Sequence, residues 1–315
     1  MTLHTAPVHK HYNGFSRFKL FFALSRTPHG LIDMSTPALG ALLWLGVFPP
    51  LKVIILGLVT AFAGYTAVYA LNDVIDYRVD KEKLQQGGLD DKGIDLDALM
   101  VRHPVAQGFL SLKEGLTWVI AWSLLALIGA YILNPVCVII FLSACLLEAV
   151  YCLMLKINHL RTFISGAVKS SGAVAAVLAV DPDPSLYFLG GLFIWLFVWE
   201  IGGQNVPNDW SDIEEDRRIN ARTVPVRYGP HKSTVIVLCS LILTVIMSAL
   251  LFLSAPADFE MPFLITVVLS GFYLLLFPAY RLYKNKESRQ ALILFNKASY
   301  YPLTLLLVVG IKLMI

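Results

Sequence analysis

Two stretches of the chain repeat one acidic pattern, Asn-Asp-x-x-Asp-x-x-x-Asp, at residues 72–80 and again at residues 208–216. Offsets of three, four and seven residues put the carboxylates of each copy on one face of a helix, where like charges repel unless a cation lies among them. Oxygen ligands without His or Cys suit Mg²⁺, which usually bridges one or two carboxylates to a substrate phosphate. The pattern predicts two facing magnesium clusters with a diphosphate between them. The predicted metal ligands are Asp73, Asp76, Asp80, Asp209, Asp212 and Asp216.

The chain that carries these clusters has the composition of a membrane protein. Hydrophobic residues make up 57% of its 315 residues and charged residues only 15%, whereas a soluble domain is about 25% charged. Apolar runs of about 20 residues predict helices that span the lipid bilayer. Nine runs qualify, at residues 31–49, 51–71, 115–133, 135–155, 163–181, 185–206, 233–254, 262–282 and 294–314. We therefore expect an all-α, multi-pass integral membrane protein with nine transmembrane helices.

Lysine and arginine predict the orientation of these helices. Nearly all of them fall in the segment before the first run and in every second loop, whereas the opposite side carries only Lys52 and Lys312. The positive-inside rule then puts the N-terminus and both acidic clusters in the cytoplasm and the C-terminus outside. The net charge of +3 is accounted for by this topology and by anionic lipid, so no nucleic-acid partner is expected. The 7 histidines scatter along the chain, so they predict no zinc or haem site.

The chain also reads as a duplication within one membrane-embedded domain, residues 1–315. A shift of 136 residues moves Asp73 onto Asp209 and the second apolar run onto the sixth. Residues 1–155 form the first half, and residues 156–315 form the second half plus an unpaired ninth helix. Four helices separate the copies, so both face the same side and the repeat is parallel, and such repeats commonly place the site between the halves. Residues 81–101 are the longest irregular stretch and are predicted to be either a lid or a solvated insertion without a role.

These motifs resemble the UbiA superfamily of intramembrane prenyltransferases. The resemblance rests on both acidic clusters, on the loops at residues 102–108 and 222–229 that follow them, and on Tyr151 with Lys156 at the end of the fourth run. It covers nearly the whole chain. It implies a nine-helix bundle, a Mg²⁺-bound prenyl diphosphate, and an acceptor that is prenylated within the membrane. The long stretch at residues 81–101 departs from the family pattern and leaves the subfamily open.

Cleavage of an allylic diphosphate leaves negative charge on the diphosphate and a cation-like prenyl chain. The residues expected to act in catalysis are Asp73, Asp76, Asp209, Asp212, Lys156 and Tyr151. Those expected to bind substrate are Asn72, Asn208, Arg102, Arg222, Tyr65, Tyr69 and Trp199. Among the latter, the arginines would contact the phosphates together with Lys156, and the rings would face the prenyl cation. For each ring, a place in an interfacial aromatic belt or ordinary packing is the alternative.

Four ionisable residues lie within or beside the apolar runs, namely Asp33, Glu148, Lys169 and Glu200. Charge inside a membrane is costly, so each is a candidate functional residue. A carboxylate among them would orient or deprotonate the acceptor. The alternative is structural, in which a carboxylate bonds to a neighbouring helix or pairs with Lys169.

The sequence thus predicts a Mg²⁺-dependent transferase that moves an isoprenoid chain from a prenyl diphosphate to a membrane-accessible aromatic or lipid-like acceptor, in quinone or related lipid synthesis. Within the superfamily, haem O synthase-like chemistry and geranylgeranyl transfer to a glycerol phosphate are alternatives. A transporter is a second class of function, but the acidic residues sit at helix ends and not at the midplane. A non-catalytic scaffold is a third, although six intact aspartates would be costly without metal.

Overall fold

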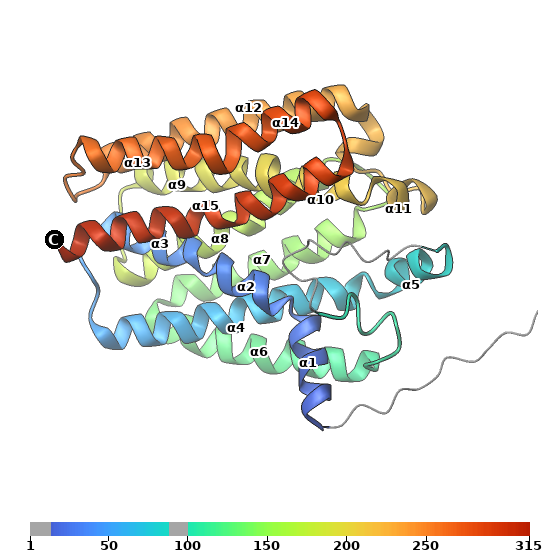
Figure 1. Ribbon diagram of the computed structural model, residues 1–315. Helices are drawn as coiled ribbons and strands as arrows, with labels where there is room; N and C mark the ends of the chain where they lie inside the picture. The colour runs from blue at the N-terminus through green and yellow to red at the C-terminus, as the bar shows by residue number, and fades with distance from the viewer. Residues whose placement is uncertain (1–13, 88–99) are drawn as a thin grey trace, which may run out of the picture.

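The computed structural model describes residues 14–87 and 100–315, and within these ranges all regular structure is helical (Figure 1). The first part of the chain forms α1 (Gly14–Leu24), α2 (Thr27–Asp33), α3 (Ser35–Leu45), α4 (Leu51–Ile75), α5 (Tyr77–Gln85), α6 (Leu112–Leu133) and α7 (Pro135–Leu153). The second part forms α8 (Arg161–Val180), α9 (Leu186–Trp199), the π-helical η1 (Glu200–Asn205), α10 (Val206–Ser211), α11 (Ile213–Arg218), α12 (Val224–Ser254), α13 (Met261–Gly271), the π-helical η2 (Phe272–Leu276), α14 (Phe277–Asn285) and α15 (Ser288–Met314). The predicted all-α fold is confirmed.

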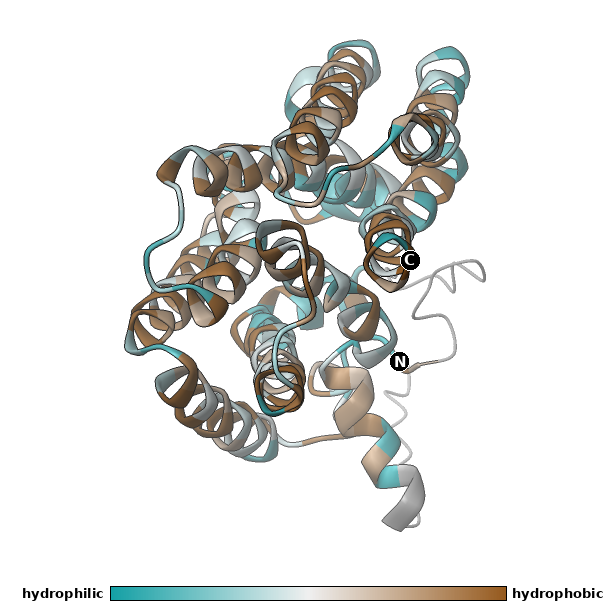
Figure 2. Ribbon diagram, turned by 90° about the vertical axis from the view of Figure 1, so that its left-hand side faces the viewer, coloured by the Kyte–Doolittle hydropathy of each residue, from teal (hydrophilic) through white to brown (hydrophobic). Residues whose placement is uncertain are grey.

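Eight helices in the described part of the chain are long and apolar enough to cross a membrane. They correspond to the second to ninth predicted runs, with η1 and η2 continuing the helices on either side of them. Figure 2 looks along the bundle and shows hydrophobic residues over most of each long helix. The chain is therefore a multi-pass membrane protein, and the side on which each terminus lies stays a prediction.

The first predicted run is not one continuous helix, because α2 ends at Asp33 and α3 begins at Ser35. Pro37 has no N–H to donate to the carbonyl of Asp33, four residues earlier. The Thr36 hydroxyl donates to that carbonyl instead, at 3.0 Å. The local sequence thus breaks the run and leaves Asp33 at a helix end inside the bundle.

Two loop predictions also change. The stretch at residues 81–101 was predicted to be irregular, but its start belongs to α5, which continues to Gln85. Residues 88–99, the centre of the predicted lid, lie outside the described residues. The seventh run begins nine residues earlier than predicted, at Val224, and bends at Gly229, whose φ of 72° lies in the left-handed region that favours glycine.

The halves of the duplication are arranged as a parallel repeat. In Figure 1, α4 and α9 run in the same direction, and α5 and α11, which follow them, lie at the same end of the bundle. The packing repeats as well, because α4 packs on α6 in the first half and α9 packs on α12 in the second. Both acidic clusters are therefore delivered to one end of the molecule.

The hydrophobic core lies mostly in the second half. Its largest cluster gathers buried side chains of α9, α12 and α15 around Trp195, Trp199 and Tyr301. Gly202 and Gly203 in η1 let this helix approach its neighbours closely, since a Cβ at these positions would come within 2.7 Å of Ser240 and 2.9 Å of Ala298. Pro207 cannot donate to the carbonyl of Gly203, which favours the widened π turn at this point. A firm core thus anchors the helix that carries the second cluster.

A glycine substitution tests the contact between α4 and α6. A Cβ at Gly129 would lie 2.0 Å from Thr60 Oγ1 and 3.1 Å from Thr60 Cβ, so Gly129→Ala forces the two helices apart. We expect it to lower the free energy of unfolding by about 1–3 kcal/mol, as overpacking does. Gly190→Ala is the matched control, because nothing lies within 4 Å of its added Cβ. Thermal unfolding in detergent should separate the two variants, and equal melting temperatures would contradict the packing described.

Candidate active site

The two acidic motifs adopt the same local structure. In each, the motif's first two residues lie in the last turn of a helical segment, its second aspartate is the junction that follows, and its third aspartate lies in the first turn of a short helix. Asp76 is the junction between α4 and α5, and Asp212 is the junction between α10 and α11. The N–H of the last aspartate donates to the junction carbonyl at 2.9 Å in both copies, from Asp80 to Asp76 and from Asp216 to Asp212. The repeat therefore extends from sequence to backbone geometry.

Both motifs line one polar cavity of about 130 Å³. The predicted site residues that line it are Asn72, Asp73, Asp76, Asp80, Arg102, Tyr151, Asn208, Asp209, Asp212 and Asp216. Lys83 and Arg161 line the cavity as well. The two clusters thus face each other across a space small enough for a single compact anionic group.

Cations from the first half pair with the acidic cluster of the second half. Lys83 Nζ lies 3.3 Å from Asp216 Oδ1. Arg102, in the loop before α6, lies 3.9 Å from Asp212 Oδ2 and 3.8 Å from Glu215 Oε1. These ion pairs join the halves across the cavity and offset part of the repulsion among the carboxylates.

Arg161 was not predicted as a site residue. It is the first residue of α8, only 5% of its surface is exposed, and its Nη1 lies 3.8 Å from Asp209 Oδ1. Its guanidinium stacks 3.9 Å from the centre of the Tyr151 ring. Tyr151 is itself fixed, since its hydroxyl accepts a hydrogen bond from Asn205 Nδ2 at 2.9 Å. Arg161 is therefore a rigid cation that faces the cavity, although in the sequence it is simply one more basic residue at a helix end.

His103 is the second unpredicted residue of the site. Its Nδ1 lies 2.6 Å from Asp73 Oδ1 and 2.9 Å from Asp80 Oδ2, which the backbone achieves with a positive φ of 48°. Burial opposes the charge, but the Asp80 and Asp73 carboxylates outweigh it and raise the pKa of His103 to about 9. Burial likewise opposes ionisation of Asp80, yet His103 lowers the pKa of that carboxyl. The sequence, in which the histidines scatter and predict no zinc or haem site, did not identify this role, because only the fold of the loop brings His103 between these aspartates.

The carboxylates have open capacity for a metal ion. Burial and the neighbouring Asp80 raise the pKa of Asp76 to about 6, so the ionised form needs a compensating cation. Among the described residues, no hydrogen-bond donor reaches Asp73 Oδ2 in the first cluster or Asp209 Oδ2 in the second, and both atoms are buried. Asp73, Asp80 and His103 also bring their ligand atoms within 4.8 Å of one another. An oxygen-rich set of this kind suits Mg²⁺.

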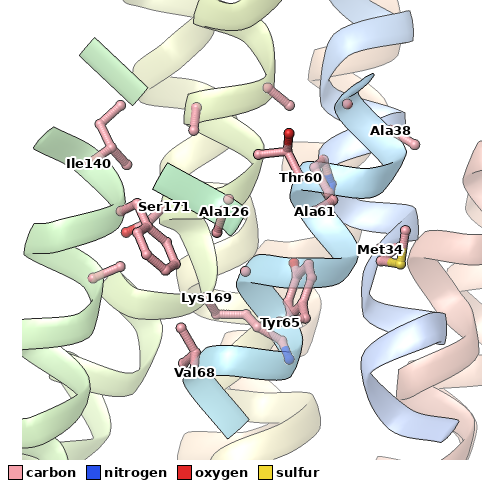
Figure 3. Close-up of a pocket in the computed structure, with 18 of the residues that line it drawn as sticks. Met34, Ala38, Thr60, Ala61, Tyr65, Val68, Ala126, Ile140, Lys169 and Ser171 are labelled. Carbon is pink, nitrogen blue, oxygen red and sulfur yellow. The ribbon is translucent and has the colours of Figure 1, made fainter. Parts of the chain in front are cut away.

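A second, larger cavity of about 540 Å³ adjoins the polar one, with Arg26, Asn72, Tyr151 and Asn208 lining both. Away from these shared residues its lining becomes apolar, with small side chains such as Ala61 and Ala126 (Figure 3). Tyr65 and Tyr69 line it near the polar end, with their rings stacked 6.4 Å apart. The site is therefore a small polar chamber opening into a long apolar one.

Three predicted site residues do not line either cavity. Lys156 donates to Glu82 Oε2 at 2.6 Å, and the exposed Arg222 donates to the carbonyl of Ile157 at 3.3 Å. Trp199 is fully buried and donates to the carbonyl of Ala298 at 3.1 Å. These contacts hold the side chains away from both chambers. Phosphate contacts by Lys156 or Arg222 thus remain untested predictions, and Lys83 and Arg161 are better placed for them.

The four ionisable residues of the apolar runs gather at the polar end of the larger cavity. Asn72 Nδ2 donates to Glu148 Oε1 at 2.7 Å, which ties a buried carboxylate to the first acidic motif. Lys169 pairs with Asp33 and lies 4.0 Å from Glu200 Oε2. The predicted pairing with Lys169 is therefore present, and Glu148, Lys169 and Glu200 also line the cavity.

Comparisons with known proteins agree with this architecture. The sequence model of the UbiA prenyltransferase family matches residues 34–300. The chain is 25% identical to a digeranylgeranylglyceryl phosphate synthase of Thermococcus sibiricus over 278 residues, which cover 87% of this chain and 89% of that protein. It is 25% identical to the synthase of Methanosphaera stadtmanae over 246 residues, 78% of this chain and 82% of that one.

Solved structures show the same fold. A UbiA homologue from Aeropyrum pernix K1 has a TM-score of 0.71 at 17% identity, covering 91% of this chain and 97% of that one. A UbiA homologue from Archaeoglobus fulgidus bound to GPP and Mg²⁺ has a TM-score of 0.67 at 18% identity, covering 94% of this chain and 99% of that one.

Metal binding at the clusters is testable without an activity assay. Mg²⁺ that binds only the folded protein stabilises it by about 2.7 kcal/mol at a concentration a hundred times its dissociation constant. We expect Mg²⁺ to raise the melting temperature of the purified protein, and Asp209→Asn to remove most of this rise. Asp183→Asn, on an exposed loop remote from the clusters, should respond like the wild type. Equal Mg²⁺ responses in all three proteins would contradict metal binding at the clusters.

Proposed function

Because this chain belongs to the UbiA prenyltransferase family, we propose that it transfers an isoprenoid chain from a Mg²⁺-bound prenyl diphosphate to an acceptor within the membrane. One observation carries the proposal: two facing acidic motifs line a small polar chamber, and this chamber is continuous with a large apolar one through four shared residues. A prenyl diphosphate has the same division between a compact anionic head and an apolar tail. As a prenyltransferase, the chain is an enzyme and not a transporter or a scaffold.

The polar chamber is suited to the diphosphate. Asp73, Asp76, Asp209 and Asp212 would hold Mg²⁺, which when bound neutralises the charge that develops on the departing diphosphate. The side-chain nitrogen of Asn72 donates a hydrogen bond to Glu148. The side-chain oxygen of Asn72 is therefore left to face a metal ion or the substrate.

Arg161 and Lys83 would assist departure of the diphosphate. Arg161 is buried and stacked on Tyr151, so it presents its guanidinium without a large loss of side-chain freedom on binding. Lys83 approaches from α5 and already lies beside Asp216. Preorganised cations of this kind stabilise a developing anion, because they do not need to reorient during the reaction.

The apolar chamber is suited to the prenyl tail. Along α4 its lining runs from Val53 to Asn72, about 28 Å at 1.5 Å per residue, which is close to the thickness of a bilayer core. Tyr65 and Tyr69 stand at its polar end, where an allylic cation would form, and aromatic faces stabilise cations by about 0.5–2 kcal/mol. The tail would therefore extend along α4, away from the clusters.

For the acceptor, we favour a glycerol-phosphate lipid. The matching relatives are named for digeranylgeranylglyceryl phosphate, a glycerol phosphate with two isoprenoid chains. An aromatic acceptor in quinone synthesis stays a prediction of the sequence, as does haem O synthase-like chemistry. The experiment is to incubate the protein in lipid nanodiscs with labelled geranylgeranyl diphosphate, Mg²⁺, and either geranylgeranylglyceryl phosphate or 4-hydroxybenzoate, and to identify products by mass. A prenylated product that disappears with chelator is expected, and its absence with every acceptor would contradict the proposal.

A double-mutant cycle tests the shared chamber. If both clusters hold one diphosphate, Asp76→Ala and Asp212→Ala should each reduce transfer by about a hundredfold or more. The double variant should then lose much less than the product of the two losses, because a site that is already broken has little left to lose. Residual transfer rates, measured at high enzyme concentration, distinguish one shared site from two independent sites. Strictly multiplicative losses would indicate two independent sites.

A substitution in the apolar chamber tests the path of the tail. Gly57 lines the chamber, and nothing lies within 4 Å of a Cβ added there. Gly57 lies 15 residues before Asn72, about 22 Å along the axis of α4. We expect Gly57→Trp to raise the KM for geranylgeranyl diphosphate several-fold and to leave the KM for the shorter dimethylallyl diphosphate unchanged. An equal effect on both donors would place the tail elsewhere.

A further inference from the structure

Lys169, Asp33 and Glu200 form a charged group at the polar end of the apolar chamber that the binding of a diphosphate and a prenyl tail does not use. The group comes from three elements, since Asp33 ends α2, Lys169 lies in α8 and Glu200 begins η1. Figure 3 shows the Lys169 side chain extending toward Tyr65 of α4. Lys169 Nζ lies 3.3 Å from the hydroxyl of Tyr69, three residues before Asn72 or about 4.5 Å along the helix axis. The group is thus about one helical turn from the metal motif.

Asp33 is held in place within this group. One of its oxygens, Oδ2, accepts hydrogen bonds from Lys169 and from the Tyr69 hydroxyl, and His29 Nε2 lies 3.7 Å from the same atom. Asp33 does not line the chamber. Asp33 holds the Lys169 ammonium in place, and Lys169 in turn lies beside the Glu200 carboxylate.

Glu200 has an open acceptor atom. Its Oε1 accepts a hydrogen bond from the Ser165 hydroxyl at 2.7 Å. No hydrogen-bond donor among the described residues reaches Oε2, although Lys169 Nζ lies 4.0 Å from it. Only 7% of the Glu200 surface is exposed, and the residue lines the chamber. A buried polar atom without a hydrogen bond costs about 1–3 kcal/mol, more for a charged group, and an apolar prenyl tail cannot relieve that cost.

The charge balance indicates the chemistry of the missing partner. Lys169 is shared by the Asp33 and Glu200 carboxylates, so with both ionised these three side chains carry one net negative charge. His29, 3.7 Å from Asp33 Oδ2, offsets that charge only when it is protonated. A phosphate or carboxylate placed against Oε2 would meet this charge and be repelled. A hydroxyl group can donate to Oε2 and remain neutral, and hydrogen bonds to charged groups contribute about 1.5–3 kcal/mol.

We propose that Glu200 binds the hydroxyl group of the acceptor, with Lys169 and Ser165 as the residues that position its carboxylate. The inference rests on the proposed prenyl transfer and adds the acceptor's recognition group, an alcohol or phenol O–H and not an anionic group. Glu200 is then a substrate-contacting residue, and any anionic part of the acceptor lies elsewhere. A glyceryl ether and a phenol share this hydroxyl chemistry, and the experiment separates them.

The test compares wild type with Glu200→Gln, which keeps side-chain volume and the acceptor atom for Ser165. With geranylgeranylglyceryl phosphate and with 4-hydroxybenzoate as acceptors, we expect Glu200→Gln to raise the KM of the true acceptor about tenfold, while the KM for geranylgeranyl diphosphate changes less than twofold. The O-methylated form of that acceptor, assayed as an inhibitor, should bind the wild type about tenfold more weakly than the free hydroxyl form binds. In Glu200→Gln this difference should shrink to about twofold.

Glu260→Gln is the matched control, because Glu260 is 59% exposed, pairs with Lys312 and lines neither chamber. It should leave both KM values unchanged. If Glu200→Gln folds poorly by thermal unfolding, Ser165→Ala provides a second variant. It frees the carboxylate from its hydrogen bond, and it should raise the acceptor KM about threefold without moving the KM for the donor.

The outcomes separate this inference from the proposed function. An unchanged acceptor KM in folded Glu200→Gln and Ser165→Ala, with normal transfer by the wild type, would overturn the inference and leave prenyl transfer intact. Tighter acceptor binding by Glu200→Gln would also overturn it, since that result indicates an anionic group beside the carboxylate. Absence of transfer by the wild type with every acceptor would defeat the proposed function and the inference together.

Discussion

Carboxylates that share a buried cavity repel one another, and this repulsion explains the arrangement of cations around the two acidic motifs. Some of these cations reach across from the other half of the repeat, whereas Arg161 and His103 belong to the same half as the aspartates they face. Lys83 and Arg102 of the first half pair with the second motif, and Arg161, at the start of α8, pairs with Asp209. The compensation is incomplete, because Asp73 Oδ2 and Asp209 Oδ2 keep open capacity. The candidate metal site therefore lies between the halves, because both acidic motifs line the same polar cavity.

Polar and apolar residues are also separated along the lining of the two chambers. Polar groups concentrate where α4 and α10 end, and the lining becomes apolar with distance from that end. Asn72, the first residue of the first acidic motif, lies at the boundary between them and donates a hydrogen bond to Glu148. η1 packs closely on its neighbours at Gly202 and Gly203, and it continues into α10, so Glu200, Asn205 and Asp209 lie on one helical segment. A small shift of that segment would therefore move Asp209 and Glu200 together.

Much of the fold and of the candidate site could be predicted from the sequence, because the helices and the acidic motifs depend on local spacing. The repeated motif predicted the facing clusters, and long apolar runs predicted eight of the helices. The break between α2 and α3 was missed, although Pro37 carries its cause. His103 and Arg161 could not be placed by spacing, because their roles depend on a loop with positive φ at His103 and on the position of α8 against α10. Lys156 and Arg222 were expected to contact the phosphates because of their charge. In the structure, Lys156 donates to Glu82 and Arg222 donates to the carbonyl of Ile157.

The duplication explains why the end that carries the acidic motifs is nearly symmetric while the apolar chamber is not. The last aspartate of each motif donates to its junction carbonyl over the same 2.9 Å, since each motif needs the same turn between two helices to present its carboxylates. Away from the motifs the halves differ. The second half fills its interior with Trp195, Trp199 and Tyr301, whereas the first half leaves a chamber beside α4 lined by small residues. A symmetric diphosphate calls for matched ligands on both sides, but a single tail needs only one chamber. The proposed substrate would therefore place different demands on the two ends, and the packed core of the second half supports α8 and η1, which contribute to the lining of the chamber.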